Sequence, residues 1–258
     1  MNDFDEIGNF GNYGELVNLE SPYTVKTRED LLSLLPKNNH FNSLVEFGCA
    51  DGKNLIYFQD ALKIKSENCF GVDICDSVIN ENKSFKFEHS SIENFLNDNK
   101  KKYDLVLLSD VLEHLYNPWE CLDKIYNILN KEGYILISVP NLQNLKYLNS
   151  VVDGNFFYEK TGLFDQTHIR FFSQNTLIKY LEKINFKIDK LGWRPDGSLM
   201  NLKNQMLDQL ANKTDVALQN NFISVRINKE NIENYFSQQI LISACLLYTS
   251  PSPRDKRQ

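Results

Sequence analysis

Residues 45–52 read VEFGCADG, an apolar stretch that runs directly into two glycines, Gly48 and Gly52. A short apolar run followed by glycines is typical of a buried strand whose turn leads straight into a helix. Residues 53–62 then carry apolar side chains at helical spacing, which predicts that helix. The stretch therefore predicts the strand–turn–helix crossing of a parallel sheet.

Strands and helices alternate along most of the remaining chain. Alternation of this kind predicts a doubly wound α/β fold, with a mostly parallel seven-stranded sheet and helices on both of its faces. The last strand is expected to run antiparallel to its neighbours. The expected strands are residues 43–47, 69–74, 85–88, 103–108, 133–139, 186–191 and 239–244.

The clearest helix signal lies between the fourth and fifth of these strands. Asn117 can cap the helix, Pro118 suits its first position, and Glu120 lies in its first turn. We expect this helix to end at Gly133, after Lys131.

Two segments interrupt the alternation. Residues 141–172 are rich in aromatic side chains, and residues 193–236 are polar and partly helical. We expect both to be insertions that cover a substrate, within a domain that spans residues 27–244, preceded by a flexible N-terminal arm at residues 1–26. Residues 245–258, CLLYTSPSPRDKRQ, differ in composition from the chain before them. They look like translated sequencing-adapter read-through, although a natural Pro/Ser tail is the alternative.

Composition and charge exclude several classes of protein. The 258 residues suit one large domain, and the net charge of −6 argues against a nucleic-acid partner. The five cysteines form no CxxC pair, which suits a reducing compartment. No apolar stretch reaches the ~18 residues that a membrane span requires. We therefore expect a globular cytoplasmic protein, of open oligomeric state, without a membrane span.

Three successive strand ends carry the features of a ligand site. Glu46 and the two glycines end the first strand, and Asp73 ends the next one, where a carboxylate can accept hydrogen bonds from ribose hydroxyls. The apolar fourth strand ends at residues 109–110, Ser-Asp. Doubly wound folds bind their ligands at this edge of the sheet.

Four stretches together resemble the class I S-adenosylmethionine-dependent methyltransferases. They are VEFGCADG at 45–52, GVDI at 71–74, YDLVLLSDVLEHLYNP at 103–118 and GYILISVPN at 133–141. The resemblance spans residues 28–191 and is greatest to the group that includes the ubiquinone-biosynthesis O-methyltransferases. It implies a Rossmann-like fold, S-adenosylmethionine as the cofactor, and in-line transfer of a methyl group to a hydroxyl of a small molecule.

The resemblance also implies which residues hold the cofactor. Glu46 and the two glycines would line its methionine end, Asp73 would bind the ribose diol, and Ile74 would pack against the adenine. Ser91 stands where the family often has Asp, and Ala50 replaces a frequent Gly. The full expected set is Glu46, Gly48, Cys49, Ala50, Gly52, Asp73, Ile74, Ser91, Ile92, Ser109 and Asp110.

Two other functions are alternatives to methyl transfer. A nicotinamide-dependent oxidoreductase would carry a third glycine to admit a pyrophosphate, and this turn lacks it. S-adenosylmethionine has no phosphate, so the spacing favours it. A non-catalytic protein that binds S-adenosylmethionine, or a scaffold, stays an alternative.

Two histidines are the candidate catalytic residues. His114 follows the fourth strand and His168 lies in FDQTHIRFF at 164–172, and either could take a proton from the acceptor hydroxyl or serve only in packing. Some related methyltransferases bind a divalent cation through an ExxEH motif and a later His, which here would be Asp110, Glu113, His114 and His168. We favour a metal-free base, because Asp110 is one methylene shorter than the Glu of that motif.

The molecule that accepts the methyl group is the part of this function that the sequence defines least. The aromatic segment suits a sugar, a lipid-like compound or an aromatic hydroxyl compound, although its rings could simply pack the insertion onto the sheet. The acidic net charge argues against RNA.

Overall fold

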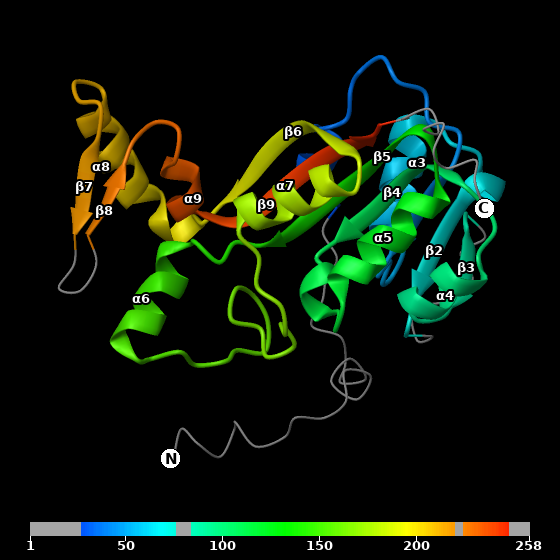
Figure 1. Ribbon diagram of the computed structural model, residues 1–258, viewed down its shortest axis with the longest axis horizontal. Helices are drawn as coiled ribbons and strands as arrows, with labels where there is room; N and C mark the ends of the chain where they lie inside the picture. Colours follow the sequence, from blue (N-terminus) through cyan, green and yellow to red (C-terminus); the bar gives the residue numbers. More distant parts are fainter. Residues whose placement is uncertain (1–26, 76–83, 220–223, 248–258) are drawn as a thin grey trace, which may run out of the picture.

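A seven-stranded sheet organises the chain in the computed structural model, which describes residues 27–75, 84–219 and 224–247 (Figure 1). The strand order is β3-β2-β1-β4-β5-β9-β6, and β9 runs antiparallel to both of its neighbours. The predicted doubly wound sheet with an antiparallel last strand is thus confirmed. Its strands are β1 (Leu44–Phe47), β2 (Cys69–Asp73), β3 (Lys86–His89), β4 (Tyr103–Ser109), β5 (Leu129–Pro140), β6 (Phe186–Pro195) and β9 (Ser237–Leu246).

Helices pack on both faces of this sheet because its central strands are apolar on both sides. In β4, Val106 and Leu108 point into one core, whereas Leu105 and Leu107 point into the other. The first core is covered by α4 (Ile92–Asp98), α5 (Pro118–Ile128) and α7 (Gln174–Lys183). The second core is covered by α2 (Glu29–Leu32) and α3 (Lys53–Leu62).

The predicted end of the helix between the fourth and fifth expected strands is wrong. Helix α5 ends at Ile128, and Leu129 already belongs to β5, where it pairs with Tyr103 of β4. The left-handed backbone position is Glu132, with φ of 58°, rather than Gly133. Gly133 lies within the strand, where an added Cβ would stand 2.9 Å from the carbonyl oxygen of Asn130. Pairing with β4 therefore overrides the helical spacing of these residues.

The strands at the C-terminal end of the chain are longer than expected. Strand β6 extends to Pro195 because Gly192 to Arg194 pair with β9. Strand β9 extends to Leu246, so two residues assigned to the C-terminal tail lie in the sheet. The remaining tail, residues 248–258, and the predicted arm, residues 1–26, lie outside the described residues.

The second insertion, together with α6 of the first, forms a lobe with its own apolar core, seen at the left of Figure 1. A hairpin and three helices enclose it. The buried members are Leu145, Met206, Leu210, Val216, Ile227, Ile232 and Phe236. The elements are α6 (Leu145–Asp153), α8 (Met200–Leu210), β7 (Val216–Gln219), β8 (Ser224–Ile227) and α9 (Ile232–Phe236). Across the described parts of the chain, no helix has the length and apolar character needed to cross a bilayer.

Replacing the cap of α5 should weaken the fold measurably. The Asn117 side chain accepts a hydrogen bond from the Glu120 backbone N–H at 3.2 Å, as the sequence predicts. Asn117→Ala should lower the free energy of unfolding by about 1 kcal/mol, measured by urea denaturation. Asn127→Ala, on the exposed face of the same helix, should change it by less than about 0.5 kcal/mol. Equal effects of the two variants would contradict the capping role.

Candidate active site

The turn between β1 and α3 requires glycine at two positions. Gly48 and Gly52 adopt φ angles of +66° and +71°. An added Cβ would lie 2.7 Å from a Val111 methyl at the first position and 2.4 Å from the Phe85 ring at the second. Ala50 also has a left-handed backbone, with φ of 43°, at a cost of roughly 1 kcal/mol. The turn therefore accepts a methyl where the related family often has Gly.

Asp73 at the end of β2 holds this turn in place. One carboxylate oxygen accepts from the backbone N–H of Ala50 at 2.8 Å, and the other accepts from that of Cys75 at 2.9 Å. Each oxygen keeps a second lone pair, so the carboxylate can also accept from a diol. The adjacent Ile74 side chain is 40% exposed, which leaves an apolar surface beside the carboxylate.

Glu46, the acidic residue of β1, is buried beneath the turn. Its Oε1 accepts from Asn54 Nδ2 at 2.6 Å, whereas its Oε2 has no partner among the described residues. Burial raises the pKa of Glu46 to about 8, although Asn54 and Arg28 act in the opposite direction. The carboxyl group is therefore largely protonated at neutral pH.

Arg28 is the residue of this site that the sequence analysis missed. Its backbone N–H donates to Asn54 Oδ1 at 2.9 Å, and its Nη1 donates to Asp110 Oδ2 at 2.9 Å and to Ser138 Oγ at 2.8 Å. The side chain is buried and links the end of β4 to β5 from within, while the backbone N–H ties the segment to α3. Burial opposes its charge, but Asp110 and Asp30 raise the pKa of Arg28 above its usual value. The neighbouring acidic residues make this segment look like an exposed helix start, so no local pattern identifies it.

Asp110 is fully engaged at this edge of the sheet. Besides Arg28, it accepts from Ser138 Oγ and Gln239 Nε2, both at 2.8 Å. The Oγ of the preceding Ser109 is buried without a partner among the described residues. The unpartnered oxygens of Ser109 and Glu46 thus lie at the ends of two paired strands, β4 and β1.

The remaining predicted cofactor residues take supporting positions. The Ser91 hydroxyl caps α4 by accepting from the Asn94 N–H at 3.2 Å, so the helix already uses it. Ile92 and Cys49 are buried. They shape the site from below rather than presenting polar groups.

The structure brings the two predicted histidines together. Their ring centroids lie 5.0 Å apart, and His114 Nδ1 donates to the carbonyl oxygen of Thr167 at 3.1 Å. The backbone N–H groups of Ile169 and Arg170 both donate to the Glu113 carbonyl oxygen, at 2.9 and 3.0 Å. These bonds dock the aromatic segment, residues 141–172, onto the loop after β4.

Glu113 lies beside this pair and is completely buried. Neither of its carboxylate oxygens has a partner among the described residues, and burial together with Asp110 raises the pKa of Glu113 well above its usual value. Burial and the neighbouring His168 lower the pKa of His114 to about 4, and burial also lowers that of His168.

Three of these side chains could hold a metal ion. One ligand atom each of Glu113, His114 and His168 lies within 4.8 Å of the others. Asp110, which the sequence analysis included in this set, is not part of the group. It is bonded to Arg28, whose charge competes for the same carboxylate.

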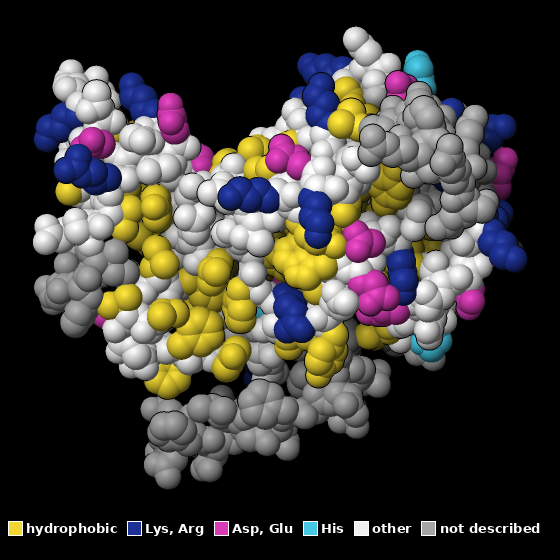
Figure 2. Space-filling model, viewed as in Figure 1, with side chains coloured by type: hydrophobic (Ala, Val, Ile, Leu, Met, Phe, Trp, Pro, Cys, Tyr) yellow, Lys and Arg dark blue, Asp and Glu magenta, His cyan; other side chains and the backbone are white. Residues whose placement is uncertain are grey.

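The aromatic segment also exposes apolar side chains. Figure 2 shows them gathered over α6 and the chain that follows it. They include Leu142, Val151, Phe157, Tyr158, Ile169 and Phe171, all more than a third exposed.

The site thus combines a glycine turn, an acidic residue near the end of each of the first two strands, and an insertion docked on the loop after the fourth strand. Residues 22–191, about two thirds of the chain, match the family described as the methyltransferase domain. The chain belongs to the methyltransferase domain family. Its fold is that of S-adenosylmethionine-dependent methyltransferases, as the resemblance to class I implied.

Several curated proteins are similar to this methyltransferase. The mitochondrial ubiquinone biosynthesis O-methyltransferase of Dictyostelium discoideum is 29% identical over 120 residues, which cover 45% of this chain and 37% of the relative. The ubiquinone biosynthesis O-methyltransferase of Rickettsia bellii is 21% identical, over 59% of this chain and 67% of the relative. The match thus spans little more than a third of the first relative's length.

Solved structures share the fold at low sequence identity. A SAM-dependent methyltransferase from Archaeoglobus fulgidus has a TM-score of 0.54 and 20% identity, over 79% of this chain and 86% of that one. The plantazolicin methyltransferase BamL, in complex with SAH, has a TM-score of 0.52 and 14% identity, over 82% of this chain and 79% of that one.

The residues at the sheet edge fit S-adenosylmethionine, the cofactor of this methyltransferase. The unpartnered oxygens of Glu46 and Ser109 suit the polar methionine end of the cofactor, because a buried polar atom without a partner is costly. Asp73 and Ile74 suit a ribose diol and an adenine ring. The ligand chemistry therefore agrees with the geometry.

The pKa of Glu46 predicts how stability depends on pH. The folded protein keeps a proton that the unfolded chain releases between its ordinary pKa of 4.5 and about 8. Stability should therefore fall as pH rises through this window, by up to about 1.4 kcal/mol per pH unit. Glu46→Gln removes one titrating group, so its unfolding free energy, measured in urea from pH 5 to 9, should fall less steeply with pH than that of the wild type; the buried Glu113 keeps its own contribution.

The exposed Glu67 provides the matched control. Glu67→Gln should reproduce the wild-type dependence on pH. A Glu46→Gln variant whose stability parallels the wild type across the window would show that Glu46 ionises normally in the folded protein.

Proposed function

We propose that this methyltransferase transfers a methyl group to a hydroxyl oxygen of a small molecule, with His114 as the base that accepts the hydroxyl proton. The observation that carries the proposal is the hydrogen bond from His114 Nδ1 to the Thr167 carbonyl oxygen. A carbonyl oxygen can only accept, so the proton of the neutral ring is on Nδ1 and Nε2 is the basic nitrogen.

The charge state of His114 supports the same role. Because its pKa is about 4, the ring is neutral at physiological pH and can act as an acceptor. A weakly basic imidazole does not ionise the hydroxyl beforehand, but it can take the proton as the new bond to carbon forms. We propose His168 as the partner that keeps this ring in place, through the ring contact at 5.0 Å.

The cofactor and the aromatic segment would supply the rest of the chemistry. S-adenosylmethionine provides an electrophilic methyl on a positively charged sulfur. The protein would align the acceptor oxygen with that methyl and exclude water, which is where most of the rate enhancement of such displacements arises. We propose that residues 141–172 form the acceptor-side wall, since their backbone is bonded to Glu113 and they include His168, whose ring contacts that of His114.

The names of the relatives support oxygen as the acceptor atom. The Dictyostelium and Rickettsia proteins that resemble this chain are named as O-methyltransferases. The exposed apolar side chains of the aromatic segment suit an acceptor with an aromatic or lipid-like portion. We propose the cytoplasm as its location, because all five cysteines lie in described parts of the chain without a disulfide.

One observation favours a second candidate, metal-assisted methyl transfer. Glu113 is buried with both carboxylate oxygens unpartnered in the described structure, beside two imidazole rings. Carboxylate and imidazole are suitable ligands for divalent ions such as Mg²⁺, Mn²⁺ or Zn²⁺. A cation held by Glu113, His114 and His168 would polarise the acceptor oxygen and lower its pKa.

Asp73 should dominate binding of the ribose. Asp73→Ala removes a charged acceptor from two hydroxyl groups, so the affinity for S-adenosylmethionine should fall by on the order of 2–4 kcal/mol, measured by calorimetry. Asp51→Ala is the control, because Asp51 lies in the turn between β1 and α3 that Asp73 holds, but its carboxylate pairs with Lys53. Unchanged affinity in Asp73→Ala would remove Asp73 from the cofactor site.

His114 should control turnover and not cofactor affinity. We expect His114→Ala to lower the release of S-adenosylhomocysteine by roughly 10²-fold or more, assayed with labelled cofactor and pooled metabolites. His40→Ala, at an exposed histidine ahead of β1, should behave as wild type. Mass spectrometry of the labelled product then identifies the acceptor.

Chelation separates the two candidate mechanisms in that assay. If His114 acts as a metal-free base, EDTA leaves turnover intact. Loss of activity with EDTA and its recovery with a divalent ion would replace the base by the metal-assisted mechanism. Wild-type turnover in His114→Ala, with a lower melting temperature, would leave this histidine a purely structural role.

A further inference from the structure

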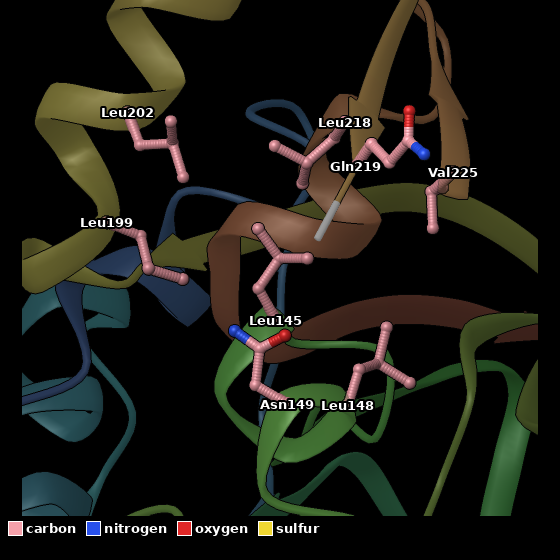
Figure 3. A pocket seen from close by; sticks show the side chains of 8 residues that line it. All are labelled: Leu145, Leu148, Asn149, Leu199, Leu202, Leu218, Gln219 and Val225. Carbon is pink, nitrogen blue, oxygen red and sulfur yellow. The ribbon is translucent and has the colours of Figure 1, made fainter. Parts of the chain in front are cut away.

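The lobe formed by the second insertion and α6 contains an apolar pocket apart from the cofactor site. Its lining comes from α6, from the 3-10 turn η3 (Gly197–Leu199) with α8, and from the hairpin β7–β8 (Figure 3). These elements are separated in sequence by up to eighty residues, so the pocket exists only because the lobe folds. The lining residues are Leu145, Leu148, Asn149, Leu199, Leu202, Leu218, Gln219 and Val225.

The chemistry of this lining is uniform. Six of the eight side chains are aliphatic, and the two polar ones, Asn149 and Gln219, are uncharged amides at exposed positions. Among the described residues, no charged side chain lines the pocket. In Figure 3, Leu145 rises from α6 toward Leu218, while Leu199 and Leu202 close one side and Leu148 and Val225 the other. A lining of this kind favours an uncharged apolar group over an ion.

The pocket is backed by packed structure. Leu145 is buried in the apolar core of the lobe, and the other five aliphatic residues are half-buried against that core. Helix α6 also packs away from the pocket, where Tyr147 contacts the rings of Phe164 and Phe171. The walls are therefore held in place without a ligand, so binding would require little reorganisation.

The volume of the pocket limits what it can hold. It measures about 190 Å³. A protein cavity of about 150 Å³ lined by similar residues binds benzene, which corresponds to about 25 Å³ per carbon atom. By that measure the pocket holds about seven carbons. This is too small for the row of side chains that a docked helix presents, and it suits a single alkyl chain.

We propose that this pocket binds an uncharged alkyl chain of about seven carbons. The chain is either the tail of the methyl acceptor or part of a separate apolar molecule. Binding is a property of the lobe alone, so it does not depend on the proposed O-methylation, and it is measured without turnover.

The test uses 1-heptanol as the probe on the full chain with labelled leucine methyl groups. Saturable shifts are expected for the methyl signals of Leu148, Leu199, Leu202 and Leu218 in the wild-type protein. The signals of Leu207, which is exposed on α8 outside the pocket, should not move. Heptanoate at pH 8 should bind at least ten-fold more weakly. Shifts without saturation, shifts elsewhere, or tighter binding of heptanoate would overturn the proposal.

A substitution that fills the pocket provides a variant with a matched control on the same helix. Leu202→Trp should abolish binding of 1-heptanol, whereas Leu207→Trp on the same helix should keep it. Equal binding by both would place the probe elsewhere and overturn the proposal. If Leu202→Trp does not fold, the wild-type methyl spectrum decides alone.

An assay of turnover distinguishes the two possible sources of the alkyl chain. Inhibition by 1-heptanol in the wild type, competitive with the acceptor pool, assigns the pocket to the acceptor's tail. Binding without inhibition assigns it to a separate apolar molecule.

Discussion

Pairing of β1 in parallel with both β2 and β4 is the constraint on which the rest of the structure depends. Leu44–Phe47 lies between these strands with all four side chains buried. Parallel neighbours need crossover connections, so the helices are forced onto the faces and the carboxyl ends of the strands meet at one edge. The main candidate cofactor groups follow from that placement: the glycine turn after β1, Asp73 at the end of β2, and Ser109 at the end of β4.

The acidic residues at that edge are of two kinds. Asp110 is bonded to Arg28 and to two neutral donors, so its oxygens are already used within the structure. Glu46 and Glu113 are buried without equivalent partners, and both are shifted toward the protonated form. Residues of the second kind are those that a ligand or cation can still engage, because a buried acceptor gains most from a new donor.

The aromatic segment and the lobe extend the same site outward. The segment is tied to the loop after β4 through the Glu113 carbonyl oxygen, and it begins in α6, which is also a wall of the leucine-lined pocket. Helix α6 therefore contacts both the aromatic rings of the segment and the apolar pocket. This is a feature of the insertions alone, because the seven-stranded sheet is complete without them.

The sequence by itself determined the fold and the cofactor edge, since both depend on local patterns. Apolar runs predict buried strands, the VEFGCADG turn predicts a strand–helix crossing, and Asp73 directly follows an apolar run. Local patterns also misled at Gly133, where helical spacing was overridden by pairing with β4. Only the tertiary structure decided the contacts between residues that are distant in sequence. Arg28 and Asp110 are 82 positions apart, and His114 and Thr167 are 53 apart. No periodicity encodes such a pair, because its partners meet only after the sheet and the insertions have packed.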